Sequence, residues 1–184
     1  MPAPNADAAY QGARGAFSEQ AARALLGAHA RLQPCRSFDE VFAALSAGLV
    51  PAAIVPLVNS LAGPVPGVAG LMRRHGTRIV TEHRLRIAHF VIGVPGATMA
   101  QVRCVWSHPM ALAQCRRWFG ERPQIAPRRS FDTAGAVAHV MALGDREEAA
   151  IAGPQAASIY GGVILAANAH DREDNTTTFA LLRV

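Results

Sequence analysis

The 184-residue sequence contains no lysine, and all 18 of its basic residues are arginines. This absence excludes mechanisms that need a lysine amine, such as a Schiff base, attachment of pyridoxal phosphate, or the lysine of a phosphate-binding P-loop. The net charge is +5, and the arginines are scattered without interleaved aromatic residues. We therefore expect no nucleic-acid partner, whereas a mild positive field suits a small anionic substrate.

Cysteines are few, and long apolar runs are absent. Cys35, Cys104 and Cys115 form neither a CxxC motif nor a metal-ligand spacing, so we expect reduced and mostly buried thiols. No apolar run approaches the roughly 18 residues of a membrane span. Residues 1–9 have neither the basic start nor the apolar centre of a signal peptide. These features predict a cytoplasmic protein with no membrane partner.

The order of short strands and short helices predicts an α/β fold with largely parallel strand pairing. We expect one domain over residues 1–184, made of two small lobes with a break near residues 93–100. The lobes are roughly residues 8–80 with 160–184, and residues 95–158. The expected strands are 8–11, 52–55, 79–80, 85–92, 102–106, 124–126, 148–151, 163–165 and 177–182, and the expected helices are 19–26 (capped by Ser18), 38–47, 65–74, 109–119, 133–142 and 155–160.

Several segments follow one another in the order and register of a known family. Together they cover residues 8 to 182, and this agreement in register is difficult to obtain by chance. The segments are YQGARGAFSEQA (10–21), VPLVNS (55–60), EHRLRIAH (82–89), SHPMALAQC (107–115), DTAGA (132–136) with AAIA (149–152) and IYG (159–161), and NTT (175–177).

With these segments the chain resembles the catalytic domain of prephenate dehydratases. The resemblance implies two α/β lobes, like those of periplasmic binding proteins, with the site in the cleft between them and usually a homodimer. It implies a carbon–oxygen lyase that removes the ring hydroxyl and ring carboxylate of prephenate, giving phenylpyruvate, carbon dioxide and water. It implies no metal and no organic cofactor. Many members carry a C-terminal ACT domain that senses phenylalanine, which we do not expect here because the chain ends too early.

The resemblance also implies site residues. Thr177 corresponds to the catalytic threonine, whose hydroxyl helps protonate the departing ring hydroxyl. An ordinary alternative is that Thr177 is simply a β-branched strand residue. The positions that match substrate contacts are Asn59, Ser60, Ser107, Gln114, Thr133, Ala134, Thr178 and Phe179.

Spacing adds detail to three of these positions. Ser107 and Gln114 are seven residues apart around a helix start, which places them on the same side of that helix. Both could then bind a carboxylate at the helix N-terminus. Alternatively, Ser107 is an ordinary N-cap and Gln114 a solvated residue. Thr133 follows Asp132 at another helix start, where it either offers backbone N–H groups to a ligand or only caps the helix. We assign His83, His89 and His108 to packing rather than to metal binding.

Two positions depart from the family pattern. Val58 stands where the family has the glutamate of Pro-Ile-Glu-Asn-Ser, and Thr178 where it has the arginine of Asn-x-Thr-Arg-Phe. Losing one partner of a buried, charge-assisted pair costs about 2–5 kcal/mol. We expect a substitute cation from Arg14, Arg84 or Arg86, with Arg14 favoured because it follows the carboxyl end of a strand.

The departures leave three functions open. The first is a divergent dehydratase acting on prephenate. The second is a repurposed lyase of specialised metabolism, which decarboxylates prephenate without aromatising it or acts on another ring acid such as a tropone precursor. The third is a non-catalytic module that binds an aromatic acid.

Overall fold

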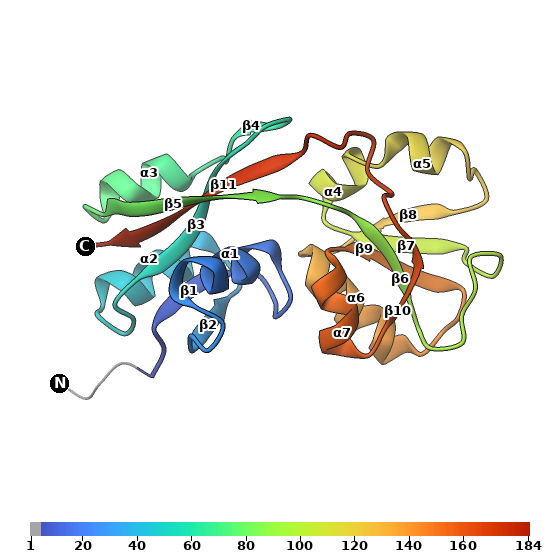
Figure 1. The fold of residues 1–184 in the computed structure, drawn as a ribbon, viewed down its shortest axis with the longest axis horizontal. Coiled ribbons are helices and arrows are strands. Elements are labelled where there is room, and N and C mark those ends of the chain that lie inside the picture. The colour runs from blue at the N-terminus through green and yellow to red at the C-terminus, as the bar shows by residue number, and fades with distance from the viewer. Residues whose placement is uncertain (1–4) are drawn as a thin grey trace. The chain divides into compact units, whose positions relative to one another are not determined.

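The structure is a computed structural model, and it describes residues 5–184. The chain divides into two compact units (Figure 1), each with its own sheet. The first unit comprises residues 5–13, Phe17–Ile87 and Asp174–Val184, and the second comprises Arg14–Ala16 and Ala88–Glu173. Residues 160–173, which we expected in the first lobe, belong to the second unit because their strand pairs with a strand of that unit's sheet.

The sheet of the first unit has the order β2-β1-β3-β11-β5, with the two-residue β4 paired to the end of β3. β1 is parallel to β2 and β3, whereas β11 runs antiparallel to both β3 and β5. This arrangement brings the end of β3 beside the start of β11. The strands are β1 (Ala8–Gln11), β2 (Leu32–Cys35), β3 (Ala53–Asn59), β4 (Gly63–Pro64), β5 (Arg78–Arg86) and β11 (Thr176–Arg183).

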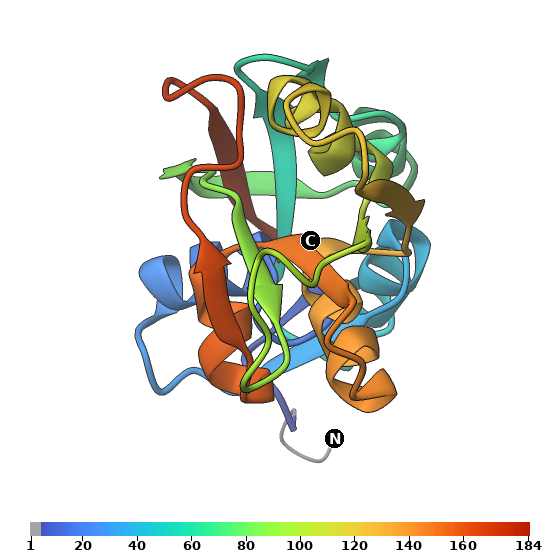
Figure 2. The same ribbon diagram turned by 90° about the vertical axis from the view of Figure 1, so that its right-hand side faces the viewer.

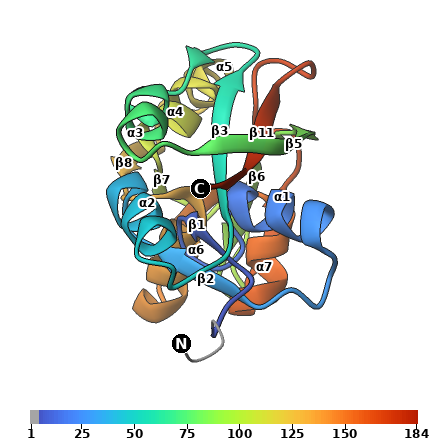
Figure 3. The same ribbon diagram turned by 90° about the vertical axis from the view of Figure 1, so that its left-hand side faces the viewer.

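Helices cover both faces of this sheet (Figure 3). α2 (Phe38–Ser46) and α3 (Val68–Arg74) pack on one face, where Phe42, Val55 and Leu182 are fully buried in a shared core. α1 (Phe17–Leu26) contacts β3, β5 and β11 on the other face. Ser37 caps α2 by accepting a hydrogen bond from the Glu40 backbone N–H at 3.2 Å. The expectation that Ser18 caps α1 is wrong, because the helix already begins at Phe17 and Ser18 lies buried in its first turn.

The sheet of the second unit has the order β10-β6-β9-β7-β8. α4 and α5 pack on one face around Val105, Trp118 and Ile151, while α6 and α7 lie on the other (Figure 2). The strands are β6 (Phe90–Gly93), β7 (Cys104–Ser107), β8 (Ala126–Arg129), β9 (Glu148–Ala152) and β10 (Val163–Ala166), and the helices are α4 (Pro109–Ala113), α5 (Arg116–Gly120), α6 (Thr133–Leu143) and α7 (Pro154–Tyr160).

The α/β class with two sheets is confirmed, but three details of the prediction are wrong. The strands expected at 79–80 and 85–92 are instead β5, which is continuous over Arg78–Arg86, and β6 over Phe90–Gly93, with residues 87–89 outside both. Each sheet mixes parallel and antiparallel pairs rather than being largely parallel. The helix expected over 109–119 is broken into α4 and α5. It breaks because the Asp171 carboxylate accepts the backbone N–H groups of Arg116 and Arg117, both at 2.9 Å, and so starts a new helix there. Within residues 5–184, no helix combines the length and apolarity needed to cross a membrane.

Candidate functional site

The side chain of Asn59 joins two predicted site segments of the first unit. Its Nδ2 group donates to Thr177 Oγ1 at 2.9 Å, to Asn175 Oδ1 at 2.8 Å and to the Thr176 carbonyl at 3.1 Å. Its Oδ1 accepts the backbone N–H groups of Leu61 and Ala62, both at 3.0 Å. One carboxamide therefore fixes the end of β3, the loop after it and the start of β11.

Thr177 lies directly opposite Asn59 in the sheet and is 7% exposed. Because Asn59 supplies a hydrogen to Thr177 Oγ1, the hydroxyl's own hydrogen is left to point elsewhere. No acceptor for that hydrogen lies among residues 5–184. A hydroxyl that accepts one hydrogen bond donates a stronger one. Thr177 is therefore held as a donor.

Ser60 and Phe179 take other roles near this hydroxyl. The Ser60 hydroxyl donates to the Asp174 carbonyl at 3.1 Å and accepts the Thr176 N–H at 3.0 Å. Phe179 shares the face of Thr177, because residues two apart in a strand point the same way, and it is 3% exposed. In this structure both residues hold β11 in place, and a contact of either with substrate stays a prediction.

The two departures from the family pattern face each other across the sheet. Val58 is the direct partner of Thr178 on one side, and Arg84 is its partner on the other. Arg84 Nε donates to Thr176 Oγ1 at 3.0 Å, so its guanidinium lies at Thr176, the residue two positions before Thr178 in β11. Thr178 shares the strand parity of Leu182, which packs against α2 and α3. It therefore points to the face opposite that of Thr177.

In the second unit, Ser107 and Gln114 are committed to internal contacts. Ser107 is fully buried, and its hydroxyl donates to the Ile151 carbonyl at 2.6 Å. Gln114 Oε1 lies 2.9 Å from His89 Nε2, which must then carry the proton. The suggestion that Ser107 caps the helix is wrong, since the cap of α4 is His108, whose Nδ1 accepts the Met110 N–H.

His89 is a core residue, as expected from the sequence. It is 2% exposed, and its backbone N–H donates to His170 Nδ1 at 3.2 Å. Burial lowers the pKa of His89 to about 4, although the bond to Gln114 acts in the opposite direction. The ring is therefore neutral at pH 7.

Thr133 and Ala134 form the first turn of α6, and neither is its cap. Asp132 caps the helix by accepting the Gly135 N–H, so Thr133 is the first helical residue. Burial lowers the pKa of His108, with the Asp132 carboxylate opposing this shift. Contact of Thr133 or Ala134 with substrate remains a prediction.

Arg14 lies exposed in the turn between β1 and α1 and clusters with the second unit. The turn approaches α7 so closely that a Cβ on Gly15 would meet the Ala156 Cα at 3.0 Å. Arg84, which we had ranked below Arg14, is the cation that the first unit places beside Thr178. The pairing of Arg84 with Thr178 depends on the register of β5, which the sequence does not show.

The cysteines and histidines form no cluster of metal ligands in the part of the chain that the structure describes. Cys35 and Cys115 are buried and Cys104 is partly buried, and none forms a disulfide, in agreement with the prediction of mostly buried thiols. Burial raises the pKa of Cys115 to about 12 and also raises that of Cys35. Neither thiol is ionised at neutral pH.

Comparison with known proteins gives a consistent result. The family model for prephenate dehydratase matches residues 8–184. A bifunctional N-acyl-homoserine lactone acylase/prephenate dehydratase from Komagataeibacter europaeus is 39% identical over 93% of this chain and 60% of its own length. Arogenate dehydratase/prephenate dehydratase 2 from Arabidopsis thaliana is 37% identical over 95% of this chain and 45% of its length. The chain thus spans about half the length of these relatives.

Solved structures agree with the fold. A prephenate dehydratase from Arthrobacter aurescens, solved with L-Phe, superposes with a TM-score of 0.86 at 29% identity, covering 95% of this chain and 60% of that one. A putative methionine-binding lipoprotein from Bacillus subtilis reaches a TM-score of 0.52 at 8% identity, covering 98% of this chain and 83% of that one, which is a likeness of fold alone.

The burial of His89 predicts a specific loss of stability in acid. Its pKa is about 4 in the folded state, against 6.5 for an ordinary histidine, so the unfolded state binds more protons between these values. Stability contributed by neutral His89 is complete above pH 6.5 and falls as the pH drops to 4, by up to about 3 kcal/mol at 1.36 kcal/mol per unit. Urea unfolding of wild type and His89→Gln from pH 4 to 7 measures this difference.

His29→Gln serves as the matched control, because His29 is exposed. It should keep the wild-type dependence of unfolding free energy on pH. An equally steep dependence in His89→Gln would show that other groups cause the loss.

Proposed function

Because the chain belongs to the prephenate dehydratase family, we propose that it catalyses the combined dehydration and decarboxylation of prephenate to phenylpyruvate. The observation that carries this proposal is the 2.9 Å hydrogen bond from Asn59 Nδ2 to Thr177 Oγ1. It connects two of the motifs in which the family's polar site residues lie, through residues 118 positions apart. It also leaves the Thr177 hydroxyl poised as a donor.

The reaction follows from this donor. As the ring C–O bond of prephenate breaks, its electron pair goes to the departing oxygen, the Thr177 hydroxyl gives its proton to that oxygen so that water leaves, and solvent returns a proton to Thr177 Oγ1. Loss of the ring carboxylate as carbon dioxide returns an electron pair to the ring, which becomes aromatic. A neutral hydroxyl is a weak acid, so its action depends on being positioned well. Asn59 supplies that positioning.

The departures at Val58 and Thr178 support retention of this chemistry. In the family pattern these positions hold a glutamate and an arginine, and here they are direct partners across two strands. An acid and a base at these positions would neutralise one another, so replacing both is a single exchange with no change of net charge. Val58 is 40% exposed, and an exposed ion pair contributes only about 0–1 kcal/mol. The exchange lies on the sheet face opposite that of Thr177.

This register revises the interpretation of the missing arginine as a lost substrate cation. Where a cation is needed on that face, Arg84 already lies beside Thr178. Arogenate, the substrate in the names of the plant relatives, is a second candidate substrate for the same hydroxyl. A non-aromatising decarboxylase and a silent binding module remain alternatives, distinguished by whether phenylpyruvate is formed.

The acylase activity named for the Komagataeibacter relative is a different reaction, which needs an activated nucleophile. Ser46 Oγ does lie 2.7 Å from His75 Nδ1. Both residues stand at the C-terminal ends of their helices, α2 and α3, where backbone carbonyls gather. Carbonyls would repel the oxyanion of amide hydrolysis. We therefore interpret the contact between Ser46 and His75 as structural. Of the two reactions, we propose dehydration rather than amide hydrolysis.

We retain the expectations of a homodimer and of a cytoplasmic location as part of this proposal. Light scattering of the purified chain should give twice the mass of one chain, and cell fractionation should recover it with cytosolic enzymes. A monomer or a membrane-bound fraction would contradict them.

Removing the Thr177 hydroxyl should abolish catalysis without unfolding the protein. We expect Thr177→Ala to lower kcat for phenylpyruvate formation at least about 100-fold, the range for loss of a positioned proton donor. Thr177→Ser, which keeps the hydroxyl, should retain more activity than the alanine variant. Steady-state assays with prephenate measure both.

The matched control is Thr81→Ala, an exposed threonine on β5 of the same sheet. It should retain wild-type kcat, and thermal unfolding should show all three variants folded. Wild-type activity in Thr177→Ala would contradict the assigned role.

Restoring the family's charged pair tests the neutral exchange. We expect Val58→Glu/Thr178→Arg to keep kcat/KM within about threefold of wild type, because the pair faces away from Thr177. Thr178→Arg alone should be less stable than the double variant, since it sets a second guanidinium beside Arg84. The coupling free energy should be about 0.2–1 kcal/mol from denaturant unfolding of the cycle.

A gain in kcat/KM of more than about 30-fold in Thr178→Arg, equivalent to about 2 kcal/mol, would contradict the claim that the charged pair is dispensable. It would show that this chain lacks a cation that catalysis needs.

A further inference from the structure

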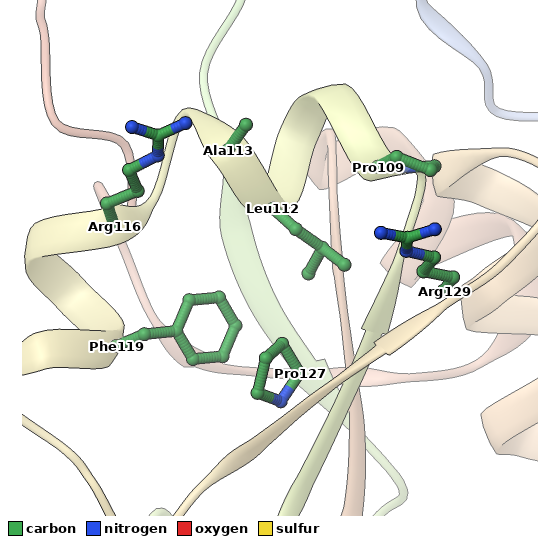
Figure 4. A pocket seen from close by; sticks show the side chains of 7 residues that line it. All are labelled: Pro109, Leu112, Ala113, Arg116, Phe119, Pro127 and Arg129. Carbon is green, nitrogen blue, oxygen red and sulfur yellow. The ribbon is translucent and has the colours of Figure 1, made fainter.

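A pocket of about 370 Å³ opens on the second unit between α4, α5 and the edge strand β8 (Figure 4). None of its lining residues is one of the predicted site residues. Those that line it are Pro109, Leu112, Ala113, Arg116, Phe119, Pro127 and Arg129.

The wall of the pocket is mostly apolar. Leu112 from α4, Phe119 from α5 and Pro127 from β8 converge on one another in Figure 4. β8 pairs with β7 on one side and forms the edge of the sheet on the other. Pro127 is tolerated there because an edge strand need not donate on its open side. The three side chains form a surface suited to a ring or a short chain.

Two guanidinium groups flank this apolar surface. Arg116 and Arg129 lie on either side of it (Figure 4), and neither side chain forms an ion pair within residues 5–184. The neighbouring carboxylate of Asp171 is turned to backbone, where its oxygens accept the N–H groups of Arg116 and Arg117. No acidic side chain lines the pocket. Within residues 5–184, neither guanidinium is therefore engaged by a carboxylate, although the Asp171 charge lies near the backbone of Arg116.

We propose that this pocket is a binding site for a small carboxylate that carries an aromatic ring or short alkyl chain and no ammonium group. The ring or chain packs on Leu112, Phe119 and Pro127, and the carboxylate is bound by Arg116 and Arg129 through charge-assisted hydrogen bonds. The volume lies within the roughly 300–1,000 Å³ of small-molecule sites. Because the pocket offers two cations and no acid, it disfavours amino acids, whose ammonium would be repelled.

The direct test is titration of 3-phenylpropionate into protein labelled at leucine methyl groups, followed by NMR. The Leu112 methyl signals should shift in a saturable way. Arg116→Gln/Arg129→Gln should weaken this binding at least about 10-fold, the effect of about 1.4 kcal/mol. L-Phenylalanine and neutral 3-phenylpropanamide should shift the same signals much less.

The matched control is Arg128→Gln, which removes the same charge from the neighbouring exposed residue of β8, on the other face of the strand. It should bind 3-phenylpropionate within about twofold of wild type, allowing for loss of one exposed charge. Absence of a Leu112 shift, equal shifts with L-phenylalanine, or equal weakening by Arg128→Gln would each overturn the proposal. So would a matching loss of kcat in the double variant, which would make the pocket part of the substrate site. The NMR binding readouts do not depend on which reaction the protein catalyses.

Discussion

The carboxamide of Asn59 is the constraint on which the candidate site depends. It is a planar group with two donors and an acceptor, and five hydrogen bonds converge on it from the loop after β3 and from the start of β11. These segments lie more than 100 residues apart in sequence. A carboxylate or an alkyl group at this position could not both donate to Thr177 and accept from Leu61 and Ala62. The position of the Thr177 hydroxyl thus depends on the pairing of two segments that are distant in the sequence of the first unit.

The same strand pairing explains why the chain tolerates its departures from the family pattern. Alternation along β11 sends Thr177 and Thr178 to opposite faces, so a change at one need not reach the other. The register places Val58 against Thr178. Two substitutions that look independent in sequence, one losing an acid and one a base, are therefore a single local exchange. Their energetic cost is that of an exposed pair, which is small.

Much of the fold could be predicted from the sequence because apolar periodicity and turn residues lie within the elements that they specify. Helices such as α2 and α6 were found within one or two residues of their observed ends. β2 has no counterpart among the expected strands; it contains Pro34 and is an edge strand, where a residue without an N–H is tolerated. The break between α4 and α5 depends on Asp171, which lies 54 residues beyond Arg117. No local pattern encodes it.

The site shows the same limit. Asn59 and Thr177 were both predicted, but only through a resemblance, and their mutual hydrogen bond follows from pairing across the sheet. Ser107 looked like a polar ligand contact, and its full burial against the Ile151 carbonyl could not be read from a helix-start spacing. Arg84 was one of three candidate cations in the sequence, and only the register of β5, which pairs it with Thr178, favours it over Arg14.

The most direct measurement is the rate at which the purified wild-type chain forms phenylpyruvate from prephenate at neutral pH, against a control without protein for spontaneous loss. Phenylpyruvate is followed by its absorbance in alkali. The account predicts formation that is proportional to protein concentration and saturates with prephenate. A rate equal to that of the control would contradict the account, even if prephenate were consumed.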